Sequence, residues 1–520
     1  MACNRPYSSP IYILDNDSLL NIFYLYRPVI LADDENDDDR ALEGGEWGRE
    51  RWWHKLTHVC RRWRYLILGS ASHLGLCLVC TYGTPVADML AHSPPLPLVI
   101  DYVADDEYDA EYEEGLILAL QFRDRVHRIR LHMCDWRLKK PITALDEEFS
   151  TLDYLDIAAQ TKYYTGLMLP KSFQAPHLRR LVLDGVACPI GSPILTPTGL
   201  VTLSLIKTNP YSSINDLLQR LSLMPQLETL GIDLDTPVSK RDIERHSPVM
   251  TTHVALPNLR WFRFKGSSDY LEAFLPRMTT PILEKLQILF FSQATYPVPH
   301  LLQFITATEN LAFHNARVTF DEEGVFVRVY PHEGAKMYAL YIEVCCSDVG
   351  GQVPGAAQIF NQLRAIFSVV DYLTLESEMS FIRHPSRKFW PILRGQWRKI
   401  LGSFNNVKVL RVGISNSFVW HLSRSLQVEE GESPLKLLPE LKELLYFTFN
   451  DDGDAFMGFV EARRNVGHPV TLIGLIRRGT VRSGDPLGSE TSTSSTSRPA
   501  FPDSSEPGGR SCLVACVSSR

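Results

Sequence analysis

The chain has 520 residues, more than one small core accounts for, and its 45% hydrophobic and 22% charged residues are typical of globular protein. A net charge of -7 argues against a dedicated nucleic-acid binder, which would carry a basic excess. No apolar run reaches the roughly 18 residues of a membrane helix, so we expect no membrane association.

The ten cysteines are scattered along the chain, and the first residues lack the basic start and apolar run of a secretory signal. We therefore expect reduced thiols and a cytoplasmic or nuclear protein. Residues 1–10 are expected to be flexible. A short helix is predicted after them, because Leu19, Ile22, Phe23 and Tyr26 recur at helical spacing, Asp15 offers an N-cap and Pro28 ends the pattern.

An acidic insertion follows at residues 31–50. Six of the seven residues from 33 to 39 are acidic, but the glycine and closing glutamate of a calcium-binding loop are not at their positions. The segment is therefore predicted to be a solvated insertion.

Residues 52–68, WWHKLTHVCRRWRYLIL, are predicted to form one amphipathic helix. Helical spacing separates His54 and His58 from Cys60, so the three side chains are not expected to meet on one zinc ion. The apolar face must pack against other parts of the protein, and it consists of Trp52, Trp53, Leu56, Val59, Cys60, Trp63, Leu66 and Ile67.

The pattern Leu19-Leu20-x-Ile22-Phe23, followed by Val59-Cys60-Arg61-Arg62-Trp63-Arg64, resembles an F-box, in particular that of the F-box proteins abundant in mushroom-forming fungi. The resemblance continues to about residue 102. It implies that residues 11–75 dock on the adaptor subunit of an SCF-type (cullin-based) ubiquitin ligase, while the rest of the chain selects a client protein. The residues that it implies for adaptor binding are Leu14, Asp15, Leu19, Leu20, Ile22, Phe23, Val59, Cys60 and Trp63.

Two features depart from the F-box pattern. The family commonly has a proline after the leucine that opens the first helix, and here Leu14 is followed by Asp15. The acidic insertion also interrupts a module that is usually compact. Both departures leave the apolar faces intact, but they are expected to weaken docking on the adaptor.

After a connecting segment at residues 76–120, an imperfect repeat runs from residue 121 to 477. An apolar frame of the form L-x-x-L-x-L returns at intervals of 22 to 32 residues over the first seven units, a spacing typical of leucine-rich repeats. The frames are Val126/Ile129/Leu131, Leu152/Leu155/Ile157, Leu178/Leu181/Leu183, Leu200/Leu203/Leu205, Leu227/Leu230/Ile232, Leu259/Phe262/Phe264, Leu283/Leu286/Ile288, Val370/Leu373/Leu375, Val407/Leu410/Val412 and Leu441/Leu444/Tyr446.

Helical patterns lie between the frames at residues 213–224, 268–278 and 389–401. The predicted fold class is therefore α/β: a small helical module followed by an irregular leucine-rich-repeat solenoid, with parallel strands on one face and helices on the other. Residues 311–368 do not fit the repeat. Residues 324–330 and 337–344 are predicted to be strands that carry no repeat frame. They form a local hairpin or interrupt the solenoid, and the sequence pattern does not distinguish these two possibilities.

No catalytic signature is recognisable, so we expect no enzymatic activity, no cofactor and no metal. Cys77 and Cys80 form a CxxC, but in a strand they would lie on opposite faces, and no second cysteine pair is at zinc spacing. The carboxylates at 105–115 are expected to be solvated. The tail at 478–520 is rich in serine, threonine, proline and glycine and is predicted to be disordered.

The sequence therefore predicts a substrate-recognition subunit that contacts an SCF adaptor, through it a cullin, and an unknown client protein, but no nucleic acid. The alternative is a repeat-based interaction scaffold with no ligase role.

Overall fold

The structure, a computed structural model, describes residues 14–27, 52–103, 111–160, 166–189, 191–208, 214–237, 252–346, 349–377, 390–413, 416–429, 431–448 and 455–476. The chain divides into two units, Met1–Arg477 and Arg478–Arg520, and every described residue belongs to the first. The predictions for residues 1–10, for the insertion at 31–50 and for the tail at 478–520 lie outside the described residues.

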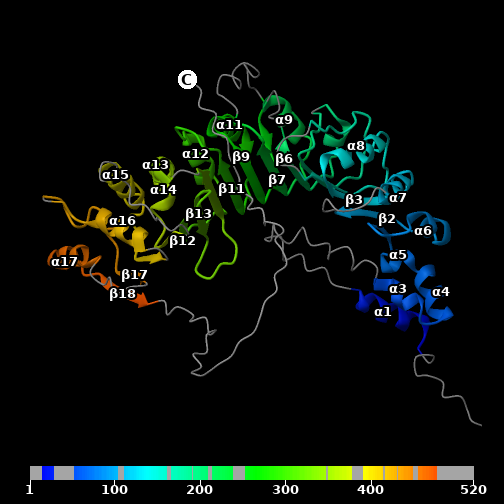
Figure 1. The fold of residues 1–520 in the computed structure, drawn as a ribbon, viewed down its shortest axis with the longest axis horizontal. Helices are drawn as coiled ribbons and strands as arrows, with labels where there is room; N and C mark the ends of the chain where they lie inside the picture. Colours follow the sequence, from blue (N-terminus) through cyan, green and yellow to red (C-terminus); the bar gives the residue numbers. More distant parts are fainter. Residues whose placement is uncertain are drawn as a thin grey trace, which may run out of the picture. The chain divides into compact units, whose positions relative to one another are not determined.

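Four short helices open the unit (Figure 1): α1 (Asn16–Tyr26), α3 (Trp52–Thr57), α4 (Arg61–Gly69) and α5 (Ala71–Leu74). The prediction of one helix across residues 52–68 was wrong, because the backbone of Cys60 is extended and this residue is the N-cap of α4. The side chain of Arg64 donates from Nε to the Thr57 carbonyl at 3.0 Å, which satisfies an acceptor at the end of α3. The break carries Val59 away from the apolar face and leaves it 56% exposed.

A 16-stranded sheet follows. Its strands as far as β11 are β1 (Leu78–Cys80), β2 (Leu98–Val103), β3 (Val126–Met133), β4 (Tyr154–Ala159), β5 (Arg180–Asp184), β6 (Thr202–Thr208), β7 (Thr229–Leu234), β9 (Trp261–Gly266) and β11 (Lys285–Phe290). The remaining strands are β12 (Asn315–Phe320), β13 (Gly324–Tyr330), β14 (Leu340–Cys345), β15 (Tyr372–Ser377), β16 (Val409–Gly413), β17 (Glu443–Thr448) and β18 (Thr471–Ile476). A separate pair joins β8 (Val254–Ala255) to β10 (Met278–Thr279).

Helices between the strands cover one face of this sheet (Figure 1). They are α6 (Val86–His92), α7 (Glu111–Leu120), α8 (Asp135–Ala144), α9 (Ile214–Leu221), α11 (Ser268–Phe274), α12 (Pro299–Ala307), α13 (Val349–Gln362), α14 (Arg364–Phe367), α15 (Trp390–Leu401), α16 (Asn416–Leu426) and α17 (Met457–Asn465), with 3-10 turns η5 (Pro193–Leu195) and η6 (Leu275–Arg277). The three helical patterns expected between frames correspond to α9, α11 and α15. The fold is thus a mixed α/β structure whose sheet is dominated by parallel pairs.

Each apolar frame places two side chains on the helix-covered face of a strand and one just before it. In the unit that forms β5, Leu178, Leu181 and Leu183 are all fully buried. The strands keep register through a recurring junction: the Asp153 carbonyl accepts from the amides of Arg179 and Arg180 at 2.9 and 3.0 Å, and comparable junctions precede β6, β7, β9 and β11. The buried apolar residues of the strands, the intervening helices and the N-terminal helices form one continuous core.

The sheet begins earlier than the sequence indicates. Residues 76–120, expected to connect two domains, contain β1, α6, β2 and α7. β1 pairs in parallel with β2, and β2 pairs in parallel with β3. Cys80 is in the main core, while Cys77 packs against Val79 and Val99 on the other side of the sheet. The two cysteines therefore face opposite sides, as predicted.

The segment that did not fit the repeat is built into the sheet. The strands predicted at 324–330 and 337–344 are β13 and β14, and β12 precedes them. β13 is antiparallel to both neighbours, so the spatial order is β11-β14-β13-β12-β15. β14 pairs in parallel with β11, and β12 pairs in parallel with β15. The three strands β12 to β14 therefore lie in the reverse of chain order, but the sheet stays continuous.

Candidate functional site

An aromatic pair and an arginine are among the contacts that join the N-terminal helices. Phe23 of α1 meets Trp63 of α4 edge to face, with ring centroids 4.7 Å apart. Arg62 donates from Nη2 to the Leu14 carbonyl at 2.6 Å and to Asn16 Oδ1 at 3.0 Å. The start of α1 is therefore fastened to α4.

Asp15 is the N-cap of α1, and its carboxylate accepts from the Ser18 amide at 2.7 Å. Hydrogen bonds from Ser18 hold the pKa of this exposed carboxyl below its usual value. Asp15 thus starts the helix without a proline, with an anion at the positive end of the helix dipole.

The residues implied by the F-box resemblance divide into two groups. Leu19 and Phe23 lie in the core, at 0% and 1% exposure, so they support the module from inside and offer no surface to a partner. Ile22 and Val59 are exposed, at 46% and 56%. Asp15 is also exposed, and the partly buried members of the set are Leu14, Leu20, Cys60 and Trp63.

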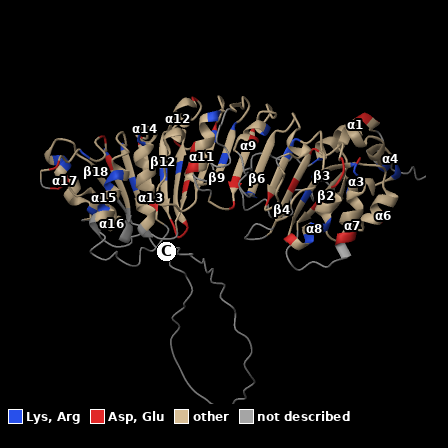
Figure 2. Cartoon of the chain, turned by 90° about the horizontal axis from the view of Figure 1, so that it is seen from above, with Lys and Arg blue, Asp and Glu red and all other residues tan. Residues whose placement is uncertain are grey.

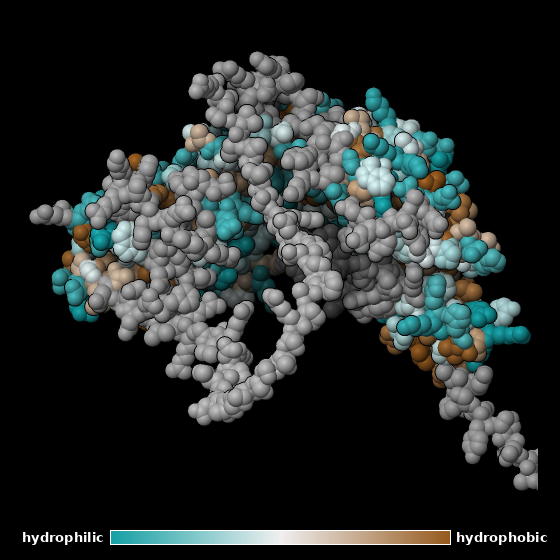
Figure 3. Space-filling model, in the orientation of Figure 1, coloured by the Kyte–Doolittle hydropathy of each residue, from teal (hydrophilic) through white to brown (hydrophobic). Residues whose placement is uncertain are grey.

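Sequence reasoning missed most of the apolar surface that surrounds Ile22 and Val59. Leu25 of α1 is 81% exposed and Tyr65 of α4 is 80% exposed, and Tyr26 is also exposed, with its ring 6.3 Å from that of Trp52. Apolar surface is visible among the N-terminal helices in Figure 3. Helical spacing placed Tyr26 on the apolar face of the first helix, and only the packing of the N-terminal helices shows that it remains exposed.

A second candidate surface is the face of the sheet opposite the helices. Acidic and basic residues are interspersed along its strands (Figure 2). On β3, Arg130 donates from Nε and Nη2 to the two carboxylate oxygens of Asp101 on β2, at 2.7 and 2.9 Å. Asp156 on β4 accepts from the Tyr154 hydroxyl at 3.1 Å and lies 2.9 Å from His132 Nε2. These contacts arise because parallel strands place outward side chains in rows across the sheet.

Aromatic side chains join this face farther along the sheet. The Lys285 ammonium lies 4.3 Å from the ring centroid of Trp261 and 4.7 Å from that of Tyr338. Aromatic and charged groups arranged in rows on the outward face of a sheet are suited to contacts with another macromolecule. Contacts of this kind need no catalytic side chain.

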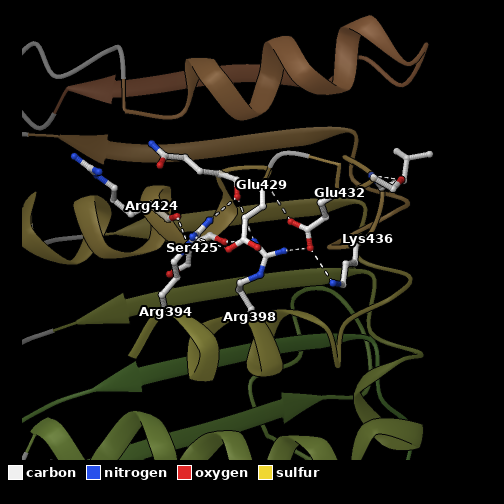
Figure 4. Close-up of polar contacts among 10 residues, drawn as sticks. Arg394, Arg398, Arg424, Ser425, Glu429, Glu432 and Lys436 are labelled. Carbon is white, nitrogen blue, oxygen red and sulfur yellow. Dashed lines mark hydrogen bonds and ion pairs between the residues drawn. The ribbon is translucent and has the colours of Figure 1, made fainter. Parts of the chain in front are cut away.

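A charged cluster between α15 and the loop after α16 is structural (Figure 4). Arg394 donates to the carbonyls of Arg424 and Gln427 at 3.2 and 3.0 Å, and Arg398 donates to the Ser425 carbonyl at 3.0 Å. These two arginines therefore satisfy acceptors at the C-terminal end of α16, where a positive charge is favourable.

Metal-ligand groups and a reactive thiol were sought among the described residues. They contain no group of three or more His, Cys, Asp or Glu side chains that could hold a metal ion. Burial and the neighbouring Glu343 carboxylate raise the pKa of the Cys345 thiol to about 12, so this thiol stays protonated and unreactive at neutral pH. No helix in the described part of the chain is long and apolar enough to cross a bilayer.

A scan against protein-family models and a search of curated proteins each found no match to this chain. By its fold, the chain is a mixed α/β protein with a long sheet of mainly parallel strands. Its candidate sites are two surfaces: the exposed apolar residues of the N-terminal helices and the outward face of the sheet.

Proposed function

We propose that the chain is a substrate-recognition subunit of an SCF-type ubiquitin ligase. In this proposal the N-terminal helices are an F-box that docks on the adaptor. The strands and helices that follow are an irregular leucine-rich-repeat solenoid whose outward sheet face binds the client. Ubiquitin transfer is carried out by other subunits, and the chain itself catalyses nothing.

The observation that carries the proposal is the exposed apolar surface of the N-terminal helices. Ile22, Leu25 and Val59 are exposed on the N-terminal helices, whereas Leu19 and Phe23 of the same helices are buried in the core that these helices share with the sheet. Apolar groups that remain exposed on a small module are typical of a surface that a partner covers. The F-box resemblance over residues 11–102 supports an SCF adaptor as that partner.

The arrangement of the sheet supports the proposed leucine-rich-repeat solenoid. Its strands follow chain order except at β12–β14, and the junction hydrogen bonds recur from unit to unit. Neighbouring units that stack in this way share one core and expose a long row of variable outward positions.

Adaptor binding tests the proposal and separates it from an interaction scaffold with no ligase role. We expect the full chain to bind purified SCF adaptor of a mushroom-forming fungus in a pull-down. The double variant Ile22→Ser, Val59→Ser should lose about tenfold or more in affinity, because truncating interface anchors typically costs ~1–2 kcal/mol each.

The matched control is Leu223→Ser, Val466→Ser, which changes two apolar residues of similar exposure, 42% and 45%, outside the N-terminal helices. This control should bind the adaptor like the wild type. No binding by the folded wild-type chain, or equal losses in both variants, would favour the scaffold.

A further inference from the structure

Two arginines lie directly opposite each other on the outward face of the sheet. β12 and β13 are antiparallel, and their register pairs Arg317 with Arg328. Both side chains are at outward positions, because the neighbours Val318 and Val327 are buried in the core. Like charges at directly opposed positions of a sheet destabilise the pairing.

The charge of this pair is only partly balanced. The nearest carboxylate to Arg317, that of Glu376, is 3.8 Å from its Nε, and the Arg317 side chain is 46% exposed. Arg328 lies over the rings of Phe326 and Tyr341, at 6.0 and 5.5 Å, and makes no ion pair with a described residue. Both guanidinium groups therefore keep donors for an anion.

A third arginine continues the same row. Thr374 of β15 pairs with Arg317, and Arg411 of β16 pairs with Thr374. We call Arg317, Arg328 and Arg411 the arginine row.

Elsewhere on this face, three basic side chains have an aspartate partner on the preceding strand. Arg130 pairs with Asp101, as described above, and Arg263 pairs with Asp233 at 2.9 Å. Lys207 similarly pairs with Asp184 at 3.1 Å. Arg317 and Arg328 therefore differ from these paired residues, because neither has an aspartate partner on a neighbouring strand among the described residues.

We propose that the arginine row binds an acidic segment of a client protein, with Asp or Glu carboxylates seated between Arg317 and Arg328. This inference deepens the proposed function and rests on it. A carboxylate there would remove the repulsion across β12 and β13 and would accept paired hydrogen bonds from a guanidinium group. Phe326 and Tyr341 add the aromatic surface that is common at the centre of protein interfaces.

The surrounding charges favour a polypeptide over a nucleic acid. Glu343 of β14 and Glu376 of β15 lie at outward positions within two strands of the arginine row. A continuous phosphate backbone would be repelled by both carboxylates, whereas a polypeptide can place acidic residues over the arginines and neutral ones over the glutamates.

The test uses the full chain and a short fluorescent peptide of alternating glutamate and alanine, followed by anisotropy. We expect binding that weakens with added salt, and about tenfold weaker binding by Arg317→Gln, Arg328→Gln. The control Arg128→Gln, Arg180→Gln removes two outward arginines from β3 and β5 and should bind like the wild type. A peptide with glutamine in place of glutamate should not bind.

Absence of binding, equal binding of the glutamine peptide, or an equal loss in the control variant would overturn the proposal. Tighter binding of a single-stranded RNA would overturn the choice of a polypeptide. The Arg317→Gln, Arg328→Gln variant should melt at or above the wild-type temperature, because a repulsive pair is removed; a clear loss would mean that the arginines are structural. Adaptor binding is measured in parallel, so a chain that binds adaptor but no acidic peptide would refute the arginine row alone.

Discussion

The Glu432 carboxylate is the centre of the charged cluster that follows α16 (Figure 4). It pairs with Arg398, accepts from the Lys436 ammonium at 2.9 Å and accepts from the Glu429 amide at 3.3 Å. Burial alone would raise the pKa of this carboxyl, but the hydrogen bonds from Lys436 and Glu429, together with Arg398, lower it to about 2 from 4.5. The ionised form therefore stabilises the loop that leads into β17.

This carboxylate makes a testable contribution to stability. A group whose pKa is lower in the folded chain contributes stability above its unfolded value, near 4.5, and that stability is lost as the pH falls toward 2. We expect Glu432→Gln to lower the melting temperature at neutral pH, and the difference from wild type to shrink below pH ~4.5. Thermal unfolding followed by circular dichroism at stepped pH measures this difference.

Glu429→Gln is the control, since the Glu429 side chain is 58% exposed and pairs with Arg394 at the edge of the same cluster. Its effect should be smaller, because exposed ion pairs contribute little. A Glu432→Gln difference that stays constant with pH would show that this carboxylate does not supply the stability.

Single-residue roles of this kind could not be predicted from the sequence. Arg463 is 1% exposed and donates to the carbonyls of Leu438, Pro439 and Leu441 at 2.9 to 3.1 Å, whereas its neighbour Arg464 is exposed. The two arginines look alike in the sequence. Their difference depends on carbonyl groups more than twenty residues away, which no local pattern encodes.

At the scale of elements, the turn between β12 and β13 decides how the reversed segment joins the sheet. Asp321 Oδ1 accepts from the amides of Glu323 and Gly324 at 2.7 and 2.9 Å, which closes the turn. A Cβ atom on Gly324 would lie 2.2 Å from the Val344 carbonyl oxygen of β14. Only glycine therefore allows β13 and β14 to approach as they do.

We expect Gly324→Ala to lower the free energy of unfolding by ~2 kcal/mol or more, because the clash is with backbone and the strands must separate. The control Gly458→Ala, in α17, meets nothing within 4 Å and should cost nothing. Urea unfolding followed by circular dichroism compares the two variants. If the Gly324→Ala variant were as stable as the wild type, β13 and β14 could move apart without loss of stability, and the argument would be wrong.

Elements with a strong period were predictable, and those set by long-range pairing were not. The apolar frames predicted the strands of ten repeat units, and the pattern at 213–224 predicted α9, because buried side chains repeat with the geometry of each element. The break between α3 and α4 was missed, since residues 58–60 are apolar or basic and carry no proline or glycine. A strand around Cys77 and Cys80 was considered, but β1 and β2 were not assigned to the sheet, because their residues lie outside the repeat frame.

At the scale of the whole molecule, the sheet divides into a face that builds the core and a face that points away from the helices. The alternation of buried and outward residues along each strand produces both, and this part of the fold follows from the sequence pattern. The pairing of outward charges does not, because it depends on which strands become neighbours. The arginine row is an example: Arg317 and Arg328 meet only through the local reversal at β12–β14.

The candidate adaptor site was likewise predictable only in part. The sequence indicated a helical module and named Ile22 and Val59, but it also named Leu19 and Phe23, which pack inside. Leu25 and Tyr65, the most exposed apolar residues of the module, lie outside the apolar faces that helical spacing predicted, but the sequence did not name them as part of a binding surface. Exposure of this kind depends on how α1, α4 and α5 pack together.

The measurement that tests the central claim most directly is hydrogen exchange of the full chain with and without the SCF adaptor. The account predicts slower exchange on binding for the amides of α1 and α4 and unchanged exchange for those of β3–β7, because the partner covers the apolar surface around Ile22 and Val59. Unchanged exchange in α1 and α4, or protection confined to the sheet, would contradict the claim that these helices are the docking module.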